Sequence, residues 1–142
     1  MIEVKRFSFS DKELADQAFA IRRKVFVEEQ SVDPALEYDH EEESHHYLLF
    51  LGETPIATAR WRETEKGIKL ERFAVLPSFR NRGIGEIILK EALKDVSSSG
   101  KLVYLHSQVK AMSFYERNGF FKVGEQFFEA GIAHFLMNYS AV

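Results

Sequence analysis

The chain contains no cysteine among its 142 residues. This absence excludes a disulfide framework, a thiolate metal site and a cysteine nucleophile. There is also no run of about 18 apolar residues that could cross a bilayer, and the residues after Met1 lack the apolar stretch of a signal peptide. We therefore expect a cytoplasmic protein with no membrane partner.

The chain also lacks a strong charge of either sign. Its 19 Lys and Arg residues against 22 Asp and Glu residues give a formal net charge of -3. Such a balance provides no general attraction to nucleic acid, although a local anion site is compatible with it. The hydrophobic content is 45%, with 13 phenylalanines, and no linker, repeat or low-complexity segment interrupts the chain. This length and composition favour one substantial core, so residues 1–142 are interpreted as a single domain.

Apolar periodicity predicts strands and helices in the order β-α-β-β-β-α-β-α-β-β. A first helix, capped by Ser10 or Asp11, keeps apolar residues at 3.6-residue spacing as far as Phe26. Another helix carries apolar residues on one side from Ile84 to Val96. The expected strands are residues 2–7, 47–51, 56–63, 68–76, 102–105, 120–128 and 132–139. This order indicates an α+β fold with a mixed sheet.

A glycine loop connects the strand ending near Pro77 to the helix that follows. It reads Arg80-Asn81-Arg82-Gly83-Ile84-Gly85. The two glycines remove side chains where a ligand would approach the backbone, and the first N-H groups of the helix have no intrahelical partner. Arg80 and Arg82 add positive charge. No Gly-Lys-Ser/Thr follows and no third glycine completes a dinucleotide motif, so we predict a phosphate site of another kind.

Two motifs in this order carry a resemblance to a known family. Arg-x-x-Gly-x-Gly after a strand resembles the acetyl-coenzyme A pyrophosphate loop of GNAT-type N-acetyltransferases. Downstream, residues 111–120 contain Ala-x-x-Phe-Tyr-x-x-x-Gly-Phe, which is similar to a second motif of that family. Other segments resemble its small bacterial ElaA/YjcF-like branch, namely residues 23–30, Glu37-Tyr38-Asp39, His46, Gln108 and residues 128–134.

The resemblance implies the GNAT acyl-CoA N-acyltransferase fold, a central mixed sheet of six to seven strands flanked by about four helices. It implies acetyl transfer from acetyl-coenzyme A to a primary amine of a small molecule or protein, by direct attack and without an acyl-enzyme. Backbone groups near Phe73 would hold the pantetheine arm and polarise the thioester carbonyl. The implied cofactor-binding residues are Phe73, Ala74, Val75, Arg80, Asn81, Arg82, Gly83, Ile84, Gly85, Gln108, Phe114 and Tyr115.

The same resemblance implies that Tyr115 protonates the departing thiolate. Attack needs a neutral amine, whereas a free alkylamine is protonated at neutral pH, so a general base or a water relay is expected. The candidate bases are Glu71 on the cofactor strand and, from the branch resemblance, Glu28, Glu29, Glu129 and His134. Each of these carboxylates is equally well explained as a surface charge or an arginine partner.

Strand alternation bears on this choice, because it would place Glu71 and Phe73 on one face of the strand, away from Arg72 and Ala74. No metal site is expected, since His45 and His46 are adjacent on a strand and face opposite sides.

The acidic run over residues 37–43 is open to two interpretations. It could line the acceptor pocket and favour a cationic acceptor such as a polyamine or amino sugar, or it could be a solvated loop. Two other functions also remain open. One is a non-catalytic module that binds or senses acyl-coenzyme A, and the other is an acyltransferase like the acyl-homoserine-lactone synthases. A homodimer is compatible with each of them.

Overall fold

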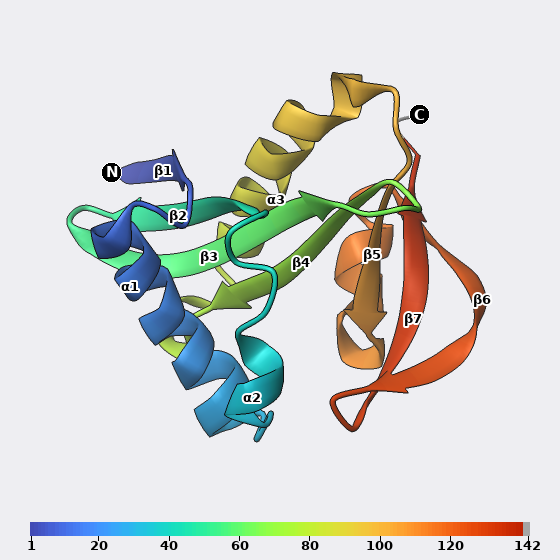
Figure 1. The fold of residues 1–142 in the computed structure, drawn as a ribbon, viewed down its shortest axis with the longest axis horizontal. Coiled ribbons are helices and arrows are strands. Elements are labelled where there is room, and N and C mark those ends of the chain that lie inside the picture. Colours follow the sequence, from blue (N-terminus) through green and yellow to red (C-terminus); the bar gives the residue numbers. More distant parts are fainter. Residues whose placement is uncertain (141–142) are drawn as a thin grey trace.

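The computed structural model describes residues 1–140, and the side chains of Leu36 and Glu37 lie outside what it describes. One seven-stranded sheet runs through these residues in the order β1-β2-β3-β4-β5-β7-β6 (Figure 1). Every neighbouring pair is antiparallel except β4 and β5, which are parallel. The strands are β1 (Ile2–Phe7), β2 (His45–Leu51), β3 (Thr54–Glu63), β4 (Ile68–Val75), β5 (Val103–Gln108), β6 (Phe120–Glu129) and β7 (Ile132–Tyr139). The predicted mixed sheet is confirmed.

Four α-helical segments lie among the described residues, and two of them are short. They are α1 (Lys12–Arg22), α2 (Pro34–Glu37), α3 (Ile84–Val96) and α4 (Met112–Glu116). Asp11 caps α1, because its carboxylate accepts a hydrogen bond from the Leu14 amide at 3.2 Å. The short α2 was not predicted, although Asp33 as N-cap and Pro34 at the first helical position are a recognised signal for a helix start.

The first helix departs from the prediction at its C-terminal end. From Arg23 to Glu29 the α-helix widens into a π-helix, whose last turn closes when the Gln30 amide donates to the Val25 carbonyl at 3.1 Å. Five-residue closure is rare and is often found beside functional sites. Here it keeps Val25 in the core while Gln30 reaches the central cleft.

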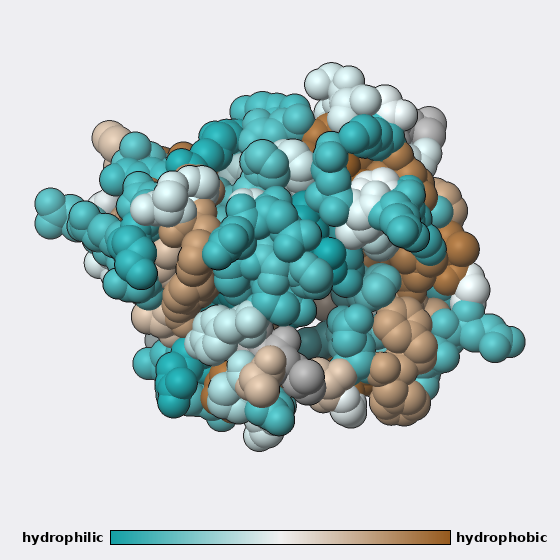
Figure 2. Space-filling model, viewed as in Figure 1, coloured by the Kyte–Doolittle hydropathy of each residue, from teal (hydrophilic) through white to brown (hydrophobic). Residues whose placement is uncertain are grey.

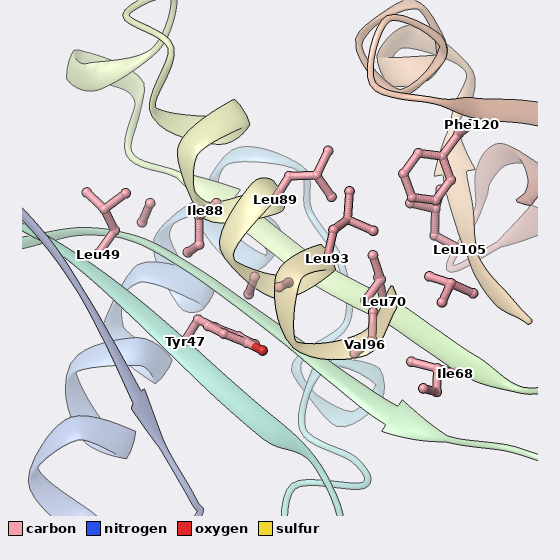
Figure 3. Packing of buried hydrophobic residues seen from close by; sticks show 14 of the residues in the cluster. Tyr47, Leu49, Ile68, Leu70, Ile88, Leu89, Leu93, Val96, Leu105 and Phe120 are labelled. Atoms are coloured by element: carbon pink, nitrogen blue, oxygen red, sulfur yellow. The ribbon is translucent and has the colours of Figure 1, made fainter. Parts of the chain in front are cut away.

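The two long helices cover opposite faces of the sheet. On one face α3 buries the side chains that its periodicity predicts, and Figure 3 shows Ile88, Leu93 and Val96 packed among strand residues such as Leu70. On the other face α1 packs Ala18 and Ile21 in a separate cluster with Leu48 and Phe50 of β2. Each fully buried aliphatic side chain contributes roughly 1.5–3 kcal/mol to stability. The sheet therefore has a core on both sides and is held rigidly.

Strands β4 and β5 separate soon after they pair. Their parallel register covers only Ile68–Leu70 opposite Val103–Leu105. Beyond this point β4 continues to Val75 and β5 to Gln108, and Figure 1 shows the two arrows diverging. The edge of β4 that faces the gap is consequently left without a strand partner.

A β-bulge in β4 overturns the predicted alternation of side chains. The register with β3 shifts between Thr58 and Arg60, and Arg72 takes the left-handed backbone conformation, with φ of 56°. Phe73 consequently packs with the α3 cluster, whereas Ala74 packs with the α1 cluster. Glu71 lies on the same side as Ala74, so the prediction that it shares a face with Phe73 was wrong. The extra residue at the bulge moves every later side chain to the other face.

The last two strands form the predicted antiparallel hairpin. Ala130 and Gly131 both have positive φ, of 52° and 76°, which is the backbone geometry of a tight two-residue turn. The turn holds Glu129 and Ile132 opposite each other at the hairpin end. This end lies beside the gap between β4 and β5. None of the helices within residues 1–140 is long and apolar enough to cross a membrane.

Candidate active site

A cleft of about 890 Å³ occupies the gap between the diverging strands. Its volume is in the range of small-molecule and cofactor sites. The lining comes from both strands, the start of α3, α4, the end of the π-helix and the β6-β7 hairpin. Figure 2 shows a hollow below the centre of the face, surrounded mostly by hydrophilic residues. Segments far apart in the chain therefore meet around one cavity.

At one end of the cleft the N-terminus of α3 presents free backbone donors. Gly83 is the N-cap with φ of 76°, and no side chain caps the first N-H groups of the helix. A Cβ on Gly83 would meet no atom within 4 Å, whereas one on Gly85 would lie 3.4 Å from the Phe114 ring. Gly83 thus leaves space open for a ligand, and Gly85 allows α3 to pack against α4. The loop has the form that phosphate binding requires, and the binding itself stays a prediction.

The two arginines of this loop are engaged differently from what the sequence suggested. Arg80 donates to both carboxylate oxygens of Glu29, at 2.6 and 2.7 Å, and its Nε donates to the Val75 carbonyl at 2.9 Å. Arg82 lies over the Phe79 ring at 5.6 Å and does not line the cleft. The loop therefore adds less positive charge to the cleft than two arginines in sequence indicate.

The remaining predicted cofactor residues line the cleft. They are Phe73, Ala74, Val75, Arg80, Asn81, Gly83, Ile84, Gly85, Gln108, Phe114 and Tyr115. Gln108 donates a hydrogen bond to the Gln30 side chain at 2.9 Å, which connects the end of β5 to the end of the π-helix. The structure thus brings together the two motifs that the sequence separates by one helix and one strand.

Tyr115 sits among aromatic rings at the inner wall of the cleft. Its ring makes edge contacts with Phe73, Phe114 and Phe120, at centroid distances of 6.3, 5.1 and 5.7 Å. Burial among them raises the pKa of the Tyr115 hydroxyl above its ordinary value. The hydroxyl makes no hydrogen bond to any side chain or backbone group that the structure describes. It is therefore a protonated donor with its proton available to a ligand.

Glu71 is held by cations. Its side chain accepts hydrogen bonds from Arg60 Nε at 2.7 Å and Arg62 Nε at 2.8 Å, and Lys69 Nζ lies 3.3 Å away. Burial by itself would raise the pKa of Glu71, but these cations outweigh it and lower the pKa to about 2. A carboxylate this acidic is a weak general base. Of the two interpretations of Glu71, the structure favours the arginine partner.

Two other candidate bases are not free in the cleft. Glu28 is 60% exposed, lies 3.8 Å from Arg23 and does not line the cavity. Glu29 is the partner of Arg80, whose hydrogen bonds lower the pKa of this carboxyl. The branch resemblance placed both residues toward the acceptor, but the π-helix directs Glu28 outward.

The hairpin end supplies a cluster that does face the cleft. Glu129 Oε1 accepts a hydrogen bond from His106 Nδ1 at 3.0 Å, and this bond lowers the pKa of Glu129. His134 Nε2 lies 3.8 Å from the other oxygen. His134 Nδ1 is 2.7 Å from the Ile132 carbonyl, which only accepts, so the proton of a neutral His134 ring is on Nδ1 and the lone pair is on Nε2.

His106 was missed at the level of sequence. It lies on β5, two residues before Gln108, so period-two spacing could have placed both side chains at the cleft.

Two carboxylates of the acidic run, Asp39 and Glu41, form ion pairs with arginines of the protein. Glu41 is 2.7 Å from Arg22 and 2.9 Å from Arg60, and Asp39 is 2.9 Å from Arg60 and 3.1 Å from Arg72. Both carboxylates pair with arginines, and Asp39 also lines the cleft, so a cationic acceptor stays a prediction. The expectation placed on Glu37 lies outside the described side chains.

The sequence pattern of the acetyltransferase (GNAT) domain matches residues 8–141. The chain belongs to the GNAT acetyltransferase family. It is 39% identical over 131 residues to YjcF of Bacillus subtilis strain 168, an uncharacterised N-acetyltransferase, and the match covers 90% of this chain and 93% of YjcF. The crystal structure of Escherichia coli ElaA superposes with a TM-score of 0.88 and 25% identity, over 99% of this chain and 100% of ElaA. The predicted family, branch and fold are confirmed.

More distant GNAT structures share the fold alone. PaiA N-acetyltransferase from Thermoplasma acidophilum, solved in complex with coenzyme A, has a TM-score of 0.66 and 20% identity, with 98% of each chain covered. The family membership and the N-acetyltransferase relative identify an acyltransferase enzyme.

Proposed function

We propose that this GNAT enzyme transfers the acetyl group of acetyl-coenzyme A directly to a primary amine. The observation that carries the proposal is the single cleft, which joins the uncapped N-terminus of α3 to the unpaired edge of β4 and to Tyr115. The coenzyme A complex of Thermoplasma acidophilum PaiA, which has the same fold, supports the choice of co-substrate.

The cofactor is bound mainly by backbone groups. The N-H groups of the first turn of α3 hold the pyrophosphate, because they have no other partner and carry the positive end of the helix dipole. The pantetheine arm lies along β4 from the bulge to Val75, where the edge of the strand toward β5 has no strand partner. A backbone N-H on this edge polarises the thioester carbonyl and stabilises the oxyanion as it forms.

Acetyl transfer then needs one proton acceptor and one proton donor. The amine nitrogen forms the C-N bond with the carbonyl carbon, the C-S bond breaks, and the thiolate takes the Tyr115 proton. The proton lost by the amine goes to Nε2 of His134, with Glu129 as the neighbouring negative charge. The cations around Glu71 lower its pKa to about 2 and make it a weak base, whereas a neutral His134 ring has its lone pair on Nε2.

The test is incubation with acetyl-coenzyme A and a panel of amines, with free thiol measured as the product and calorimetry as the measure of binding. Thiol release with any amine supports the proposal. Tight binding without release identifies a sensing module, and absence of binding overturns the cofactor assignment. His134→Gln should lower turnover about a hundredfold. Glu28→Gln, outside the cleft, is the matched control and should leave turnover unchanged.

A further inference from the structure

Two cations face each other across β3 and β4 inside the cleft. Arg62 of β3 is the direct register partner of Lys69 of β4, so both side chains project from the same face. Both line the cleft, with side chains only 16% and 12% exposed. Like charges directly opposite each other in a sheet are unfavourable, and partial burial strengthens the repulsion.

One carboxylate, that of Glu71, forms ion pairs with both of these cations. Glu71 is 2.8 Å from Arg62 and 3.3 Å from Lys69, but it also accepts a hydrogen bond from the buried Arg60. Among the side chains that the structure describes, no other carboxylate lies within ion-pair distance of Arg62 or Lys69. Arg60 has Asp39 and Glu41 as further partners, so Arg62 and Lys69 are the two cations whose one nearby carboxylate is shared at this corner of the cleft. A ligand with an anionic group would relieve the repulsion.

The phosphates of the cofactor are too far away to do so. Lys69 precedes the point where β4 and β5 separate, whereas the α3 N-terminus follows the other end of β4. The six residues from Lys69 to Val75 span roughly 20 Å of extended strand. The cationic corner formed by Arg62 and Lys69 therefore lies at the end of the cleft away from the α3 N-terminus, which is the acceptor end.

The opposite wall of the acceptor end carries a carboxylate and an imidazole instead of cations. Glu129 and His134 come from the β6-β7 hairpin, and Lys69 is near enough to Glu129 to help lower its pKa. An acceptor between these walls meets cations on one side and a carboxylate with an imidazole on the other. That arrangement complements a molecule that carries an anion and an amine a few bonds apart.

We propose that the acceptor is an amino acid or a close derivative, whose carboxylate binds Arg62 and Lys69 while its amine faces His134 and Glu129. This inference rests on the proposed acetyl transfer and names its substrate class. The planar guanidinium of Arg62 suits the two oxygens of a carboxylate. A phosphonate shares this anion chemistry, so the experiment includes it.

The experiment compares acceptors that differ only in the anionic group. Glycine, alanine, leucine, phenylalanine, lysine and glutamate are each supplied as the free acid, the 1-amide, the decarboxylated amine and the aminophosphonate, with acetyl-coenzyme A and detection of free thiol. At least one free acid should have kcat/KM tenfold or more above its amide and amine. The effect should appear mainly in KM, because the anion binds away from the reacting atoms.

Variants then assign this preference to the cationic corner. Arg62→Gln and Lys69→Gln should each reduce the ratio of acid to amide at least tenfold, and Lys69→Arg should restore most of it. Lys94→Gln removes an exposed charge on α3 outside the cleft and should leave the ratio unchanged. The melting temperature and acetyl-coenzyme A affinity of each variant separate a lost subsite from a damaged fold.

Four results would overturn the inference. Three are equal rates for acids and amides, a preference for the decarboxylated amines, and failure of every free acid as a substrate. A preference for the phosphonates over the carboxylates would replace the carboxylate with a phosphoryl-type anion and so reject the amino-acid assignment. Calorimetry with acetyl-coenzyme A alone, together with thiol release on the decarboxylated amines of glycine, alanine, leucine and phenylalanine, which carry no anionic group, reports separately on the proposed acetyl transfer.

Discussion

The two ends of the cleft are built in different ways. At the cofactor end, Gly83 and the first turn of α3 offer backbone N-H groups from one continuous stretch of chain. At the acceptor end, the chemistry comes from side chains on separate strands, among them Arg62, Lys69, His106 and Glu129. Backbone donors remain in place when many side chains change, whereas each charged group at the other end depends on its partners. This division between the two ends suits a family whose members share a co-substrate and differ in their acceptors.

The largest effect should come from the acceptor end, at Glu71. Glu71→Gln removes one of the three carboxylates around the buried Arg60, which is 1% exposed, and the one carboxylate that Arg62 and Lys69 share. Loss of one partner of a buried ion pair costs about 3–5 kcal/mol, so the free energy of unfolding in urea should fall by about that amount. Glu28→Gln, an exposed change, should stay within about 0.5 kcal/mol. A loss below about 1 kcal/mol for Glu71→Gln would show that the network does not depend on this carboxylate.

The same carboxylate predicts acid sensitivity. Folding lowers the pKa of Glu71 from 4.5 to about 2, so its contribution is complete above about pH 4.5 and is lost as the pH falls toward 2. The difference corresponds to roughly 3 kcal/mol. Urea unfolding measured between pH 6 and 2 should therefore show a steeper decline for the wild type than for Glu71→Gln. Parallel pH profiles for the wild type and Glu71→Gln would contradict the lowered pKa of Glu71 in the folded protein.

At the junction of the two ends, Tyr115→Phe tests the proton donor. The ring contacts with Phe73, Phe114 and Phe120 remain and only the hydroxyl is lost. Turnover should fall about ten- to a hundredfold, while acetyl-coenzyme A affinity stays within about twofold. Tyr139→Phe, which changes a tyrosine outside the cleft lining, is the control. Full turnover of Tyr115→Phe when chemistry limits the rate would make this tyrosine a packing residue.

At the cofactor end, a pair of variants at Gly83 separates charge from bulk. Asp and Asn have the same size and both tolerate the left-handed backbone found there, and the added Cβ meets no atom within 4 Å. Gly83→Asp should bind acetyl-coenzyme A at least tenfold more weakly than Gly83→Asn, about 1.4 kcal/mol, because a carboxylate would oppose the phosphates. Equal affinities of the two variants by calorimetry would show that the pyrophosphate does not bind at this loop.

The smallest effect should come from the pair that links the loop to the π-helix. Glu29→Gln leaves the Arg80 charge without its carboxylate partner. Acetyl-coenzyme A should then bind about two- to threefold more tightly at low salt, and the gain should disappear as salt is added. Weaker binding by this variant would instead show that Glu29 positions Arg80 for the cofactor.

The cofactor end and the fold were largely predictable because their signals are local. The periodicity of α3 gave its buried face, and the glycine at its start indicated an open helix terminus. The bulge at Arg72 had no such signal, since it arises where β4 pairs with β3, and it moved Glu71 to the face opposite Phe73. Nor did the sequence show that Glu29 neutralises Arg80, because that contact joins residues 51 positions apart.

The sequence by itself determined the order of the strands and of α1, α3 and α4, the phosphate-binding form of the loop at Gly83 and the family to which the chain belongs. These follow from side-chain spacing and backbone sterics within a few residues. Only the tertiary structure decided which charges meet. Glu71 became an ion-pair partner of pKa about 2, and His106 and His134 gathered around Glu129. Electrostatic energies depend on distance and burial in space, which separation along the chain does not specify.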